Sequence, residues 1–80
     1  MDMFNQTLKL KRKNGDIFDS VEASVQKKIY INDIKLPIEK GDHFEYVLPS
    51  GLTQNLLVTK VNLYDVGSSL DHYEIEFEKD

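Results

Sequence analysis

The sequence predicts an all-β fold, either a small six-stranded barrel or a curled meander of the SH3-like or OB-like kind, with at most one short helix. Apolar and polar residues alternate along several short segments, which is the period of half-buried strands. Turn-forming residues separate these segments, because each of the four glycines stands in a different turn: Gly15, Gly41, Gly51 and Gly67. Strands this short would expose their edges in a flat sheet, so we expect them to curl into a barrel.

The first two strands are expected to form a hairpin. Residues 7–11 alternate leucine with polar side chains, and Asn14-Gly15 is typical of a tight hairpin turn. The return strand covers residues 17–25. A helix could also begin there, capped by Asp19 or Ser20. The two-residue rhythm and the β-branched residues favour a strand, with an inward face made of Val21, Ala23 and Val25.

The middle of the chain predicts a short strand, a crossover and a fourth strand. The short strand begins at Lys27-Lys28, alternates over residues 28–32 and should end at Asn32-Asp33. Pro37 lacks the N–H that a central strand needs, so Leu36-Pro37-Ile38 is expected to cross the barrel with its apolar side chains against the core. Gly41-Asp42 then turns into a strand at residues 44–48, whose predicted core-facing side chains are Phe44, Tyr46 and Leu48.

The last two strands are the longest. A turn at Pro49-Ser50-Gly51 leads into a strand at residues 54–66. Apolar residues occupy both faces near its start, at Leu56-Leu57-Val58, which indicates coverage on both sides or a bulge that shifts the register. After a loop at residues 66–69, the final strand covers residues 72–78. Its inward side chains are predicted to be Tyr73, Ile75 and Phe77.

Length and composition indicate one small domain, residues 1–80. At this size folding buries only about 60 to 65% of the surface of the unfolded chain, so a partner could complete the core. The chain has no cysteine, no start typical of a signal peptide and no apolar run of about 18 residues, so we expect a cytoplasmic protein that does not enter a membrane. The net charge of −4 is uneven: residues 1–40 hold eight basic and six acidic residues, and residues 41–80 hold two and eight.

Residues with catalytic or metal-binding chemistry are few. His43 with Glu45 and His72 with Glu74 could present ligands to a divalent ion if their strands were neighbours, but solvated strand starts explain the same pattern better. The residue types of a serine hydrolase triad, Ser, His and Asp, occur together at Ser68, Ser69, Asp71 and His72. Nothing resembles a nucleophile elbow or a phosphate-binding glycine loop. We therefore expect no enzyme activity, no cofactor, no metal site and no small-molecule substrate.

A basic row is the best argument for nucleic-acid binding. Lys9, Lys11 and Lys13 would share the outer face of the first strand, and Tyr30 would lie near them if the third strand were alongside. A basic groove with an aromatic platform is how small barrels hold single-stranded nucleic acid. The acidic balance of the chain, with a sequence pI near 5.0, weighs against this interpretation.

An acidic row lies on the outer face of the last strand, at Glu74, Glu76 and Glu78. Charges there would discourage pairing at a sheet edge. The same row could also meet the lysines of another copy or of a partner protein and steer association. The predicted interaction surface therefore contains residues of both signs, namely Lys9, Lys11, Arg12, Lys13, Lys28, Tyr30, Glu74, Glu76 and Glu78.

Four motifs carry a family resemblance: Ala23-Ser24-Val25-Gln26, Leu36-Pro37-Ile38-Glu39-Lys40-Gly41-Asp42, Leu48-Pro49-Ser50-Gly51-Leu52 and His72-Tyr73-Glu74-Ile75. Over about residues 8–78, the set resembles a small all-β domain of unknown function that is found in bacterial and prophage-encoded proteins. Ser50 stands where that domain usually has Asn. The resemblance implies a phage structural or accessory setting, and it carries over no catalytic or binding residue.

These observations lead to the hypothesis of a non-enzymatic interaction or assembly module, bacterial or phage-encoded. Its partner is expected to be another protein or a second copy of the chain. The alternative hypothesis is a small barrel that binds single-stranded nucleic acid with the face formed by Lys9, Lys11 and Lys13.

Overall fold

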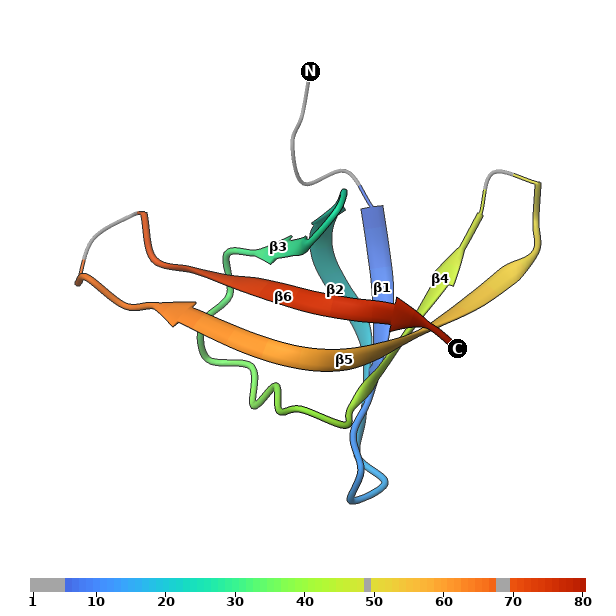
Figure 1. Cartoon of the computed structure of the whole chain (residues 1–80), viewed down its shortest axis with the longest axis horizontal. Coiled ribbons are helices and arrows are strands. Elements are labelled where there is room, and N and C mark those ends of the chain that lie inside the picture. Colours follow the sequence, from blue (N-terminus) through green and yellow to red (C-terminus); the bar gives the residue numbers. More distant parts are fainter. Residues whose placement is uncertain (1–5, 49, 68–69) are drawn as a thin grey trace.

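The computed structural model describes residues 6–48, 50–67 and 70–80, and this part of the chain contains six β-strands and no helix. The strands close into an antiparallel barrel in the order β1-β2-β3-β6-β5-β4 (Figure 1). The predicted all-β fold with six strands is therefore confirmed. The strand bounds are β1 Gln6–Lys11, β2 Ile17–Val25, β3 Ile29–Ile31, β4 His43–Val47, β5 Thr53–Tyr64 and β6 His72–Lys79.

The barrel consists of two three-stranded meanders, β1-β2-β3 and β4-β5-β6. The connection from β3 to β4, residues 32–42, crosses one end of the barrel, so that β3 pairs with β6 and β1 pairs with β4. A single continuous meander would instead pair β3 with β4. Within the described residues, no helix is long and apolar enough to cross a membrane.

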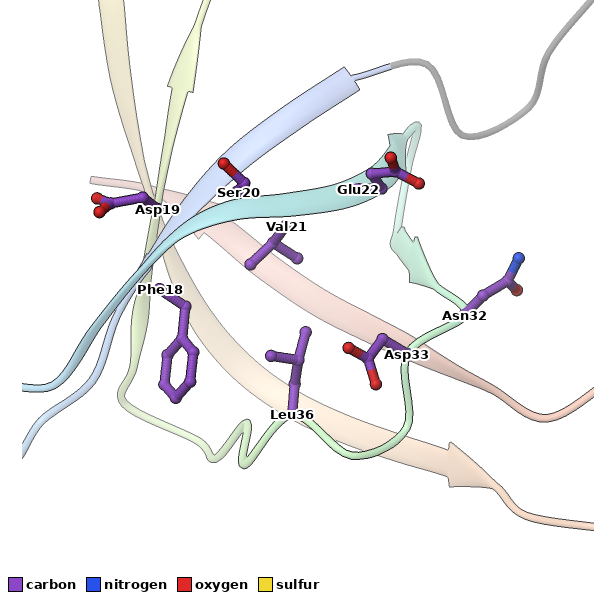
Figure 2. A pocket seen from close by; sticks show the side chains of 8 residues that line it. All are labelled: Phe18, Asp19, Ser20, Val21, Glu22, Asn32, Asp33 and Leu36. Atoms are coloured by element: carbon purple, nitrogen blue, oxygen red, sulfur yellow. The ribbon is translucent and has the colours of Figure 1, made fainter.

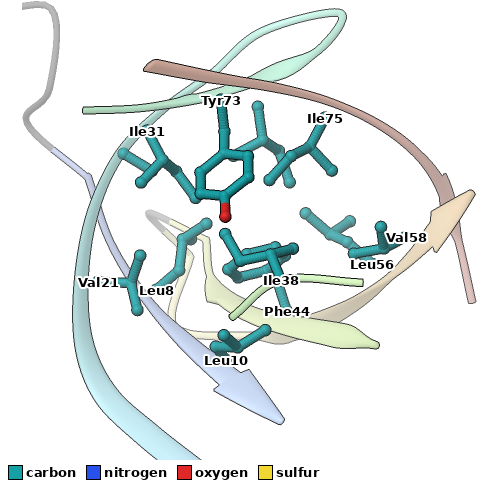
Figure 3. Packing of buried hydrophobic residues seen from close by; sticks show 12 residues of the cluster. Leu8, Leu10, Val21, Ile31, Ile38, Phe44, Leu56, Val58, Tyr73 and Ile75 are labelled. Atoms are coloured by element: carbon teal, nitrogen blue, oxygen red, sulfur yellow. The ribbon is translucent and has the colours of Figure 1, made fainter. Parts of the chain in front are cut away.

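The interior of the barrel is filled by side chains from every strand and from the crossover (Figure 3). Phe44 is fully buried at the centre, and Leu36 and Ile38 pack from the crossover as the sequence predicts. The hydroxyl of Tyr73 donates to the Leu36 carbonyl oxygen at 2.6 Å, which ties the crossover to β6. The buried apolar residues are Leu8, Leu10, Val21, Ala23, Ile29, Ile31, Ile38, Phe44, Leu56, Val58, Tyr73 and Ile75.

Two bulges adapt the long strands to the barrel. The register between β5 and β6 shifts between Val58 and Lys60, so that both Val58 and Val61 lie on the core side. This confirms the bulge that the apolar residues at the start of β5 indicate. The register between β1 and β2 also shifts, because Asp19 and Ser20 of β2 lie opposite the single residue Lys9. Such bulges increase the local twist and bend of a strand.

The turns agree with the sequence, and the predicted strand ends need small corrections. The backbone N–H of Asp16 bonds to the Asn14 side-chain oxygen in the first hairpin, where Gly15 has a φ of 97°. β5 ends at Tyr64 instead of residue 66. Leu48 was expected in the core, but it lies after β4 and outside the core cluster because its carbonyl begins the next turn by accepting the Gly51 N–H. Pro49 of that turn is outside the described residues.

The Gly41-Asp42 turn contains a buried carboxylate that sequence patterns do not reveal. Asp42 is fully buried. Its Oδ1 accepts the backbone N–H of Lys13 at 3.0 Å, and its Oδ2 accepts the backbone N–H of Glu39 at 2.8 Å. The Arg12 guanidinium lies beside it, with Nε 3.6 Å from Oδ2, and its Nη2 contacts Glu39. The carboxylate therefore joins the first hairpin to the crossover.

We predict that replacing this carboxylate destabilises the barrel. Asp42→Asn keeps the shape of the side chain but turns its NH2 group toward one of the two backbone N–H donors, that of Lys13 or that of Glu39. The free energy of unfolding, measured by urea denaturation, should therefore fall by about 2 to 4 kcal/mol. Asp65→Asn is the control, because Asp65 is exposed. That change should stay within about 0.5 kcal/mol. Equal losses in the two variants would contradict the structural role of Asp42.

Candidate interaction surfaces

The predicted basic row is already engaged by carboxylates of the same chain. Lys11 Nζ lies 2.5 Å from Glu45 Oε2, and Lys9 Nζ lies 3.9 Å from Asp19 Oδ1. The hydrogen bond from Lys11 is the main cause that lowers the pKa of Glu45. Lys13 belongs to the turn after β1 and not to the strand. The row is therefore less uniform in charge and in geometry than the alternation of the sequence implies.

Tyr30 and Lys28 lie elsewhere on the barrel. β2 separates β3 from β1, so the condition that Tyr30 stand beside the lysines of β1 is not met. Tyr30 is opposite Ser24 on β2 and Glu74 on β6. Lys28 Nζ lies 3.7 Å from Glu74 Oε1. The structure thus brings Lys28 and Tyr30 together with the acidic row and away from the other predicted basic residues.

The acidic row lies on β6, which has a neighbour along all of one side and along part of the other. β6 pairs with β5 along one side, and β3 pairs with its other side only at residues 73–75, so Glu74 does not lie at a sheet edge, whereas Glu76 and Glu78 have no described strand beside them on the β3 side. Glu74 contacts Lys28 and His72, and Glu76 Oε2 lies 3.9 Å from Lys60 Nζ. Glu78 is exposed near the C-terminal end of β6. Pairs such as these, half-exposed and salt-dependent, contribute little net affinity to association.

The two histidines do not converge. β5 lies between β4, which carries His43, and β6, which carries His72. His43 Nε2 lies 2.8 Å from Asp80 Oδ2, and His72 contacts Glu74. In the described ranges, no group of three or more His, Cys, Asp or Glu side chains could hold a metal ion. Ser68 and Ser69 are outside the described residues.

The end of the β5–β6 hairpin is an apolar surface that the sequence analysis missed. This hairpin extends beyond β3 in Figure 1. Four large side chains near its end are 45 to 74% exposed. We call them the hairpin tip: Leu63, Tyr64, Val66 and Leu70. The available signal was their placement, because the consecutive residues Leu63 and Tyr64 point to opposite faces of a strand and Val66 and Leu70 lie in the connection that follows, so that one core cannot bury all four.

Ring stacking organises one side of the hairpin tip. Tyr64 and His72 are cross-strand partners, with ring centroids 5.0 Å apart and planes at 13°. His72 Nδ1 donates to the Leu70 carbonyl oxygen at 2.7 Å, and Nε2 lies 3.1 Å from Glu74 Oε2. Both neighbours accept hydrogen bonds, so the site favours an imidazole that is protonated on both nitrogens.

A groove lies between β2 and the crossover (Figure 2). Its volume is about 540 Å³. Phe18, Val21 and Leu36 point toward one another across it, and Asp33 turns its carboxylate to the same space. We call this the β2 groove. It has an apolar floor and acidic surroundings, because its lining residues are Phe18, Asp19, Ser20, Val21, Glu22, Asn32, Asp33 and Leu36.

We predict a pH-dependent contribution from His72. The Leu70 carbonyl and then Glu74 raise its pKa above the ordinary value. The stabilisation is therefore fully present below the unfolded-state pKa, near about 6.5, and is lost as pH rises through the raised folded-state pKa. In an NMR titration, Glu74→Gln should lower the pKa of His72, whereas the control Glu78→Gln should leave it unchanged. A pKa unaffected by Glu74→Gln would show that this carboxylate does not act on the ring.

No protein-family model matches the chain, and neither the curated proteins nor the solved structures contain a significant match.

Proposed function

We propose that this protein is a non-enzymatic assembly module that associates with a second copy or with another protein through the hairpin tip. A cytoplasmic, bacterial or phage-encoded setting is part of this proposal. The observation that carries it is the concentration of exposed apolar side chains at one end of the barrel, where Val66 is 69% and Leu70 is 74% exposed. Exposed large apolar groups gathered at one end of a small protein are typical of interaction sites.

Energetic considerations favour the hairpin tip over the charged rows. Burying one large aliphatic side chain contributes about 1.5 to 3 kcal/mol, whereas an exposed ion pair contributes about 0 to 1 kcal/mol. The stacked Tyr64 and His72 rings add a rigid platform at the same end of the hairpin, on the face opposite Leu63. Aromatic groups of this kind lose little conformational entropy on binding. Association through the hairpin tip should therefore be driven by apolar burial.

The nucleic-acid alternative gains no comparable support. Lys9 and Lys11 already contact Asp19 and Glu45, and binding a phosphate would require those contacts to be replaced. Tyr30, the proposed stacking residue, lies on the far side of β2 from them. Single-strand binding by small barrels combines both features in one groove.

We predict that the wild-type protein, by light scattering after size exclusion, has a molar mass above the 9.3 kDa of one chain, alone or with the products of neighbouring genes. Because apolar burial drives association, high salt should not dissociate the complex. The double variant Leu63→Ser/Val66→Ser should lower the mass toward that of a monomer.

The matched control is Val47→Ser/Leu52→Ser. These two residues are 58% and 68% exposed around the β4–β5 turn, so the control removes similar apolar groups at another place. It should leave the molar mass unchanged. A wild-type protein that remains monomeric under every condition, or a control as disruptive as the tip variant, would refute assembly through the hairpin tip.

A further inference from the structure

Among the residues that the structure describes, one side of β2 is without a neighbour over much of its length. β2 has nine residues and β3 has three, and the two strands share only the pairs Ser24 with Tyr30 and Val25 with Ile29. β1 pairs along the other side of β2, from Ile17 to Ala23. In the described chain, no strand and no backbone hydrogen bond occupies the side of residues 18–22 that faces away from β1. We call this side the free edge of β2.

The hydrogen-bonding groups of Glu22 point away from β1. The Gln26 N–H donates to the Lys28 carbonyl across the β2–β3 turn, while the Val25 N–H donates to the Gln6 side chain on β1. Successive residues of an antiparallel strand direct their N–H and C=O to opposite sides. Glu22 therefore faces the same side as Gln26, and its backbone N–H and C=O have no partner among the described residues.

The β2 groove lies along this free edge. Phe18 and Val21 line it from β2, and Leu36 lines it from the crossover (Figure 2). Its volume of about 540 Å³ is within the range of ligand-binding clefts, roughly 300 to 1,000 Å³. An added strand would continue the sheet beside β2, and every second side chain of that strand would face Phe18, Val21 and Leu36.

The charges around the β2 groove specify the partner. Asp19, Glu22 and Asp33 line it, and all three are exposed. Among the described cations, only Lys9 forms an ion pair with any of them, at 3.9 Å from Asp19. The groove is therefore acidic and complementary to lysine or arginine.

We propose that the β2 groove binds an extended basic segment of a partner protein, which adds as a strand to the free edge of β2. Apolar residues of that segment face Phe18, Val21 and Leu36, and alternate lysine or arginine residues lie beside Glu22. The site is separate from the hairpin tip, and binding there does not depend on assembly through the tip.

The test uses a fluorescently labelled hexapeptide in which lysine alternates with valine or leucine. Its binding to the full chain is measured by anisotropy. A peptide of the same composition with its three lysines in one block is the control for charge alone. We expect the alternating peptide to bind at least about fivefold more tightly than the block peptide. As an extended strand, only the alternating peptide has one apolar face for the groove and one basic face for Glu22. Hydrogen exchange by NMR should show that the alternating peptide slows exchange of the Glu22 amide.

Three substitutions separate charge from backbone pairing. Glu22→Gln removes the charge and keeps the N–H, so binding should weaken about twofold to fivefold. Glu22→Pro removes both, and loss of the N–H donor should weaken binding by about a further fivefold to tenfold. Proline is tolerated at an unpaired strand edge. Glu78→Gln, on β6, is the control and should bind as the wild type does.

The outcomes distinguish strand addition from its alternatives. Equal binding of both peptides, no binding, or a Glu22 amide that stays unprotected would overturn the proposal. Protection of the Glu22 amide that rises with protein concentration in the absence of peptide would also overturn it, because a second copy would then occupy the groove. If Glu22→Pro does not fold, the hydrogen exchange of the Glu22 amide in the wild type and the peptide affinity of Glu22→Gln still test strand addition. The double variant Leu63→Ser/Val66→Ser should bind the peptide as the wild type does. A failure of assembly through the hairpin tip would therefore not affect the test of the β2 groove.

Discussion

The buried carboxylate of Asp42 is the interaction on which the closure of this barrel depends. The two meanders are joined by residues 32–42, which must cross one end of the barrel so that β4 starts beside β1. Asp42 fixes the end of that crossover through the Lys13 and Glu39 amides. Its backbone also pairs with β5, because its carbonyl accepts the Val58 N–H at 2.9 Å. A buried charge is tolerated only where such donors surround it.

The same turn explains why Gly41 precedes Asp42. Gly41 has a φ of 93°, and a Cβ at this position would lie 2.9 Å from Lys13 Cδ. The first hairpin therefore packs directly on the turn whose carboxylate holds it. The crossover, once anchored here, runs past the short β3 and beside β2 instead of extending the sheet. The free edge of β2 and the groove along it are consequences of this route.

The elements of the barrel were predictable from local patterns, but its closure and its surfaces were not. Alternation located every strand, and the excess of apolar residues around Leu57 indicated a bulge that the structure contains. Burial of Asp42 was not predictable, since an aspartate after glycine is typical of a solvated turn. The distance of Tyr30 from the lysines depends on the strand order, which is decided by contacts far apart in the sequence.

The charge asymmetry of the sequence has a different meaning in the folded chain. Ion pairs join the basic first half to the acidic second half, as between Lys11 and Glu45 and between Lys28 and Glu74. Folding thus pairs basic residues of the first half with acidic residues of the second half, and it does not separate the two charges onto two faces of the barrel. The acidic side chains around the β2 groove, Asp19, Glu22 and Asp33, come from the half whose net charge is positive. The potential at a surface therefore follows from which charges remain unpaired there, and not from the count along the chain.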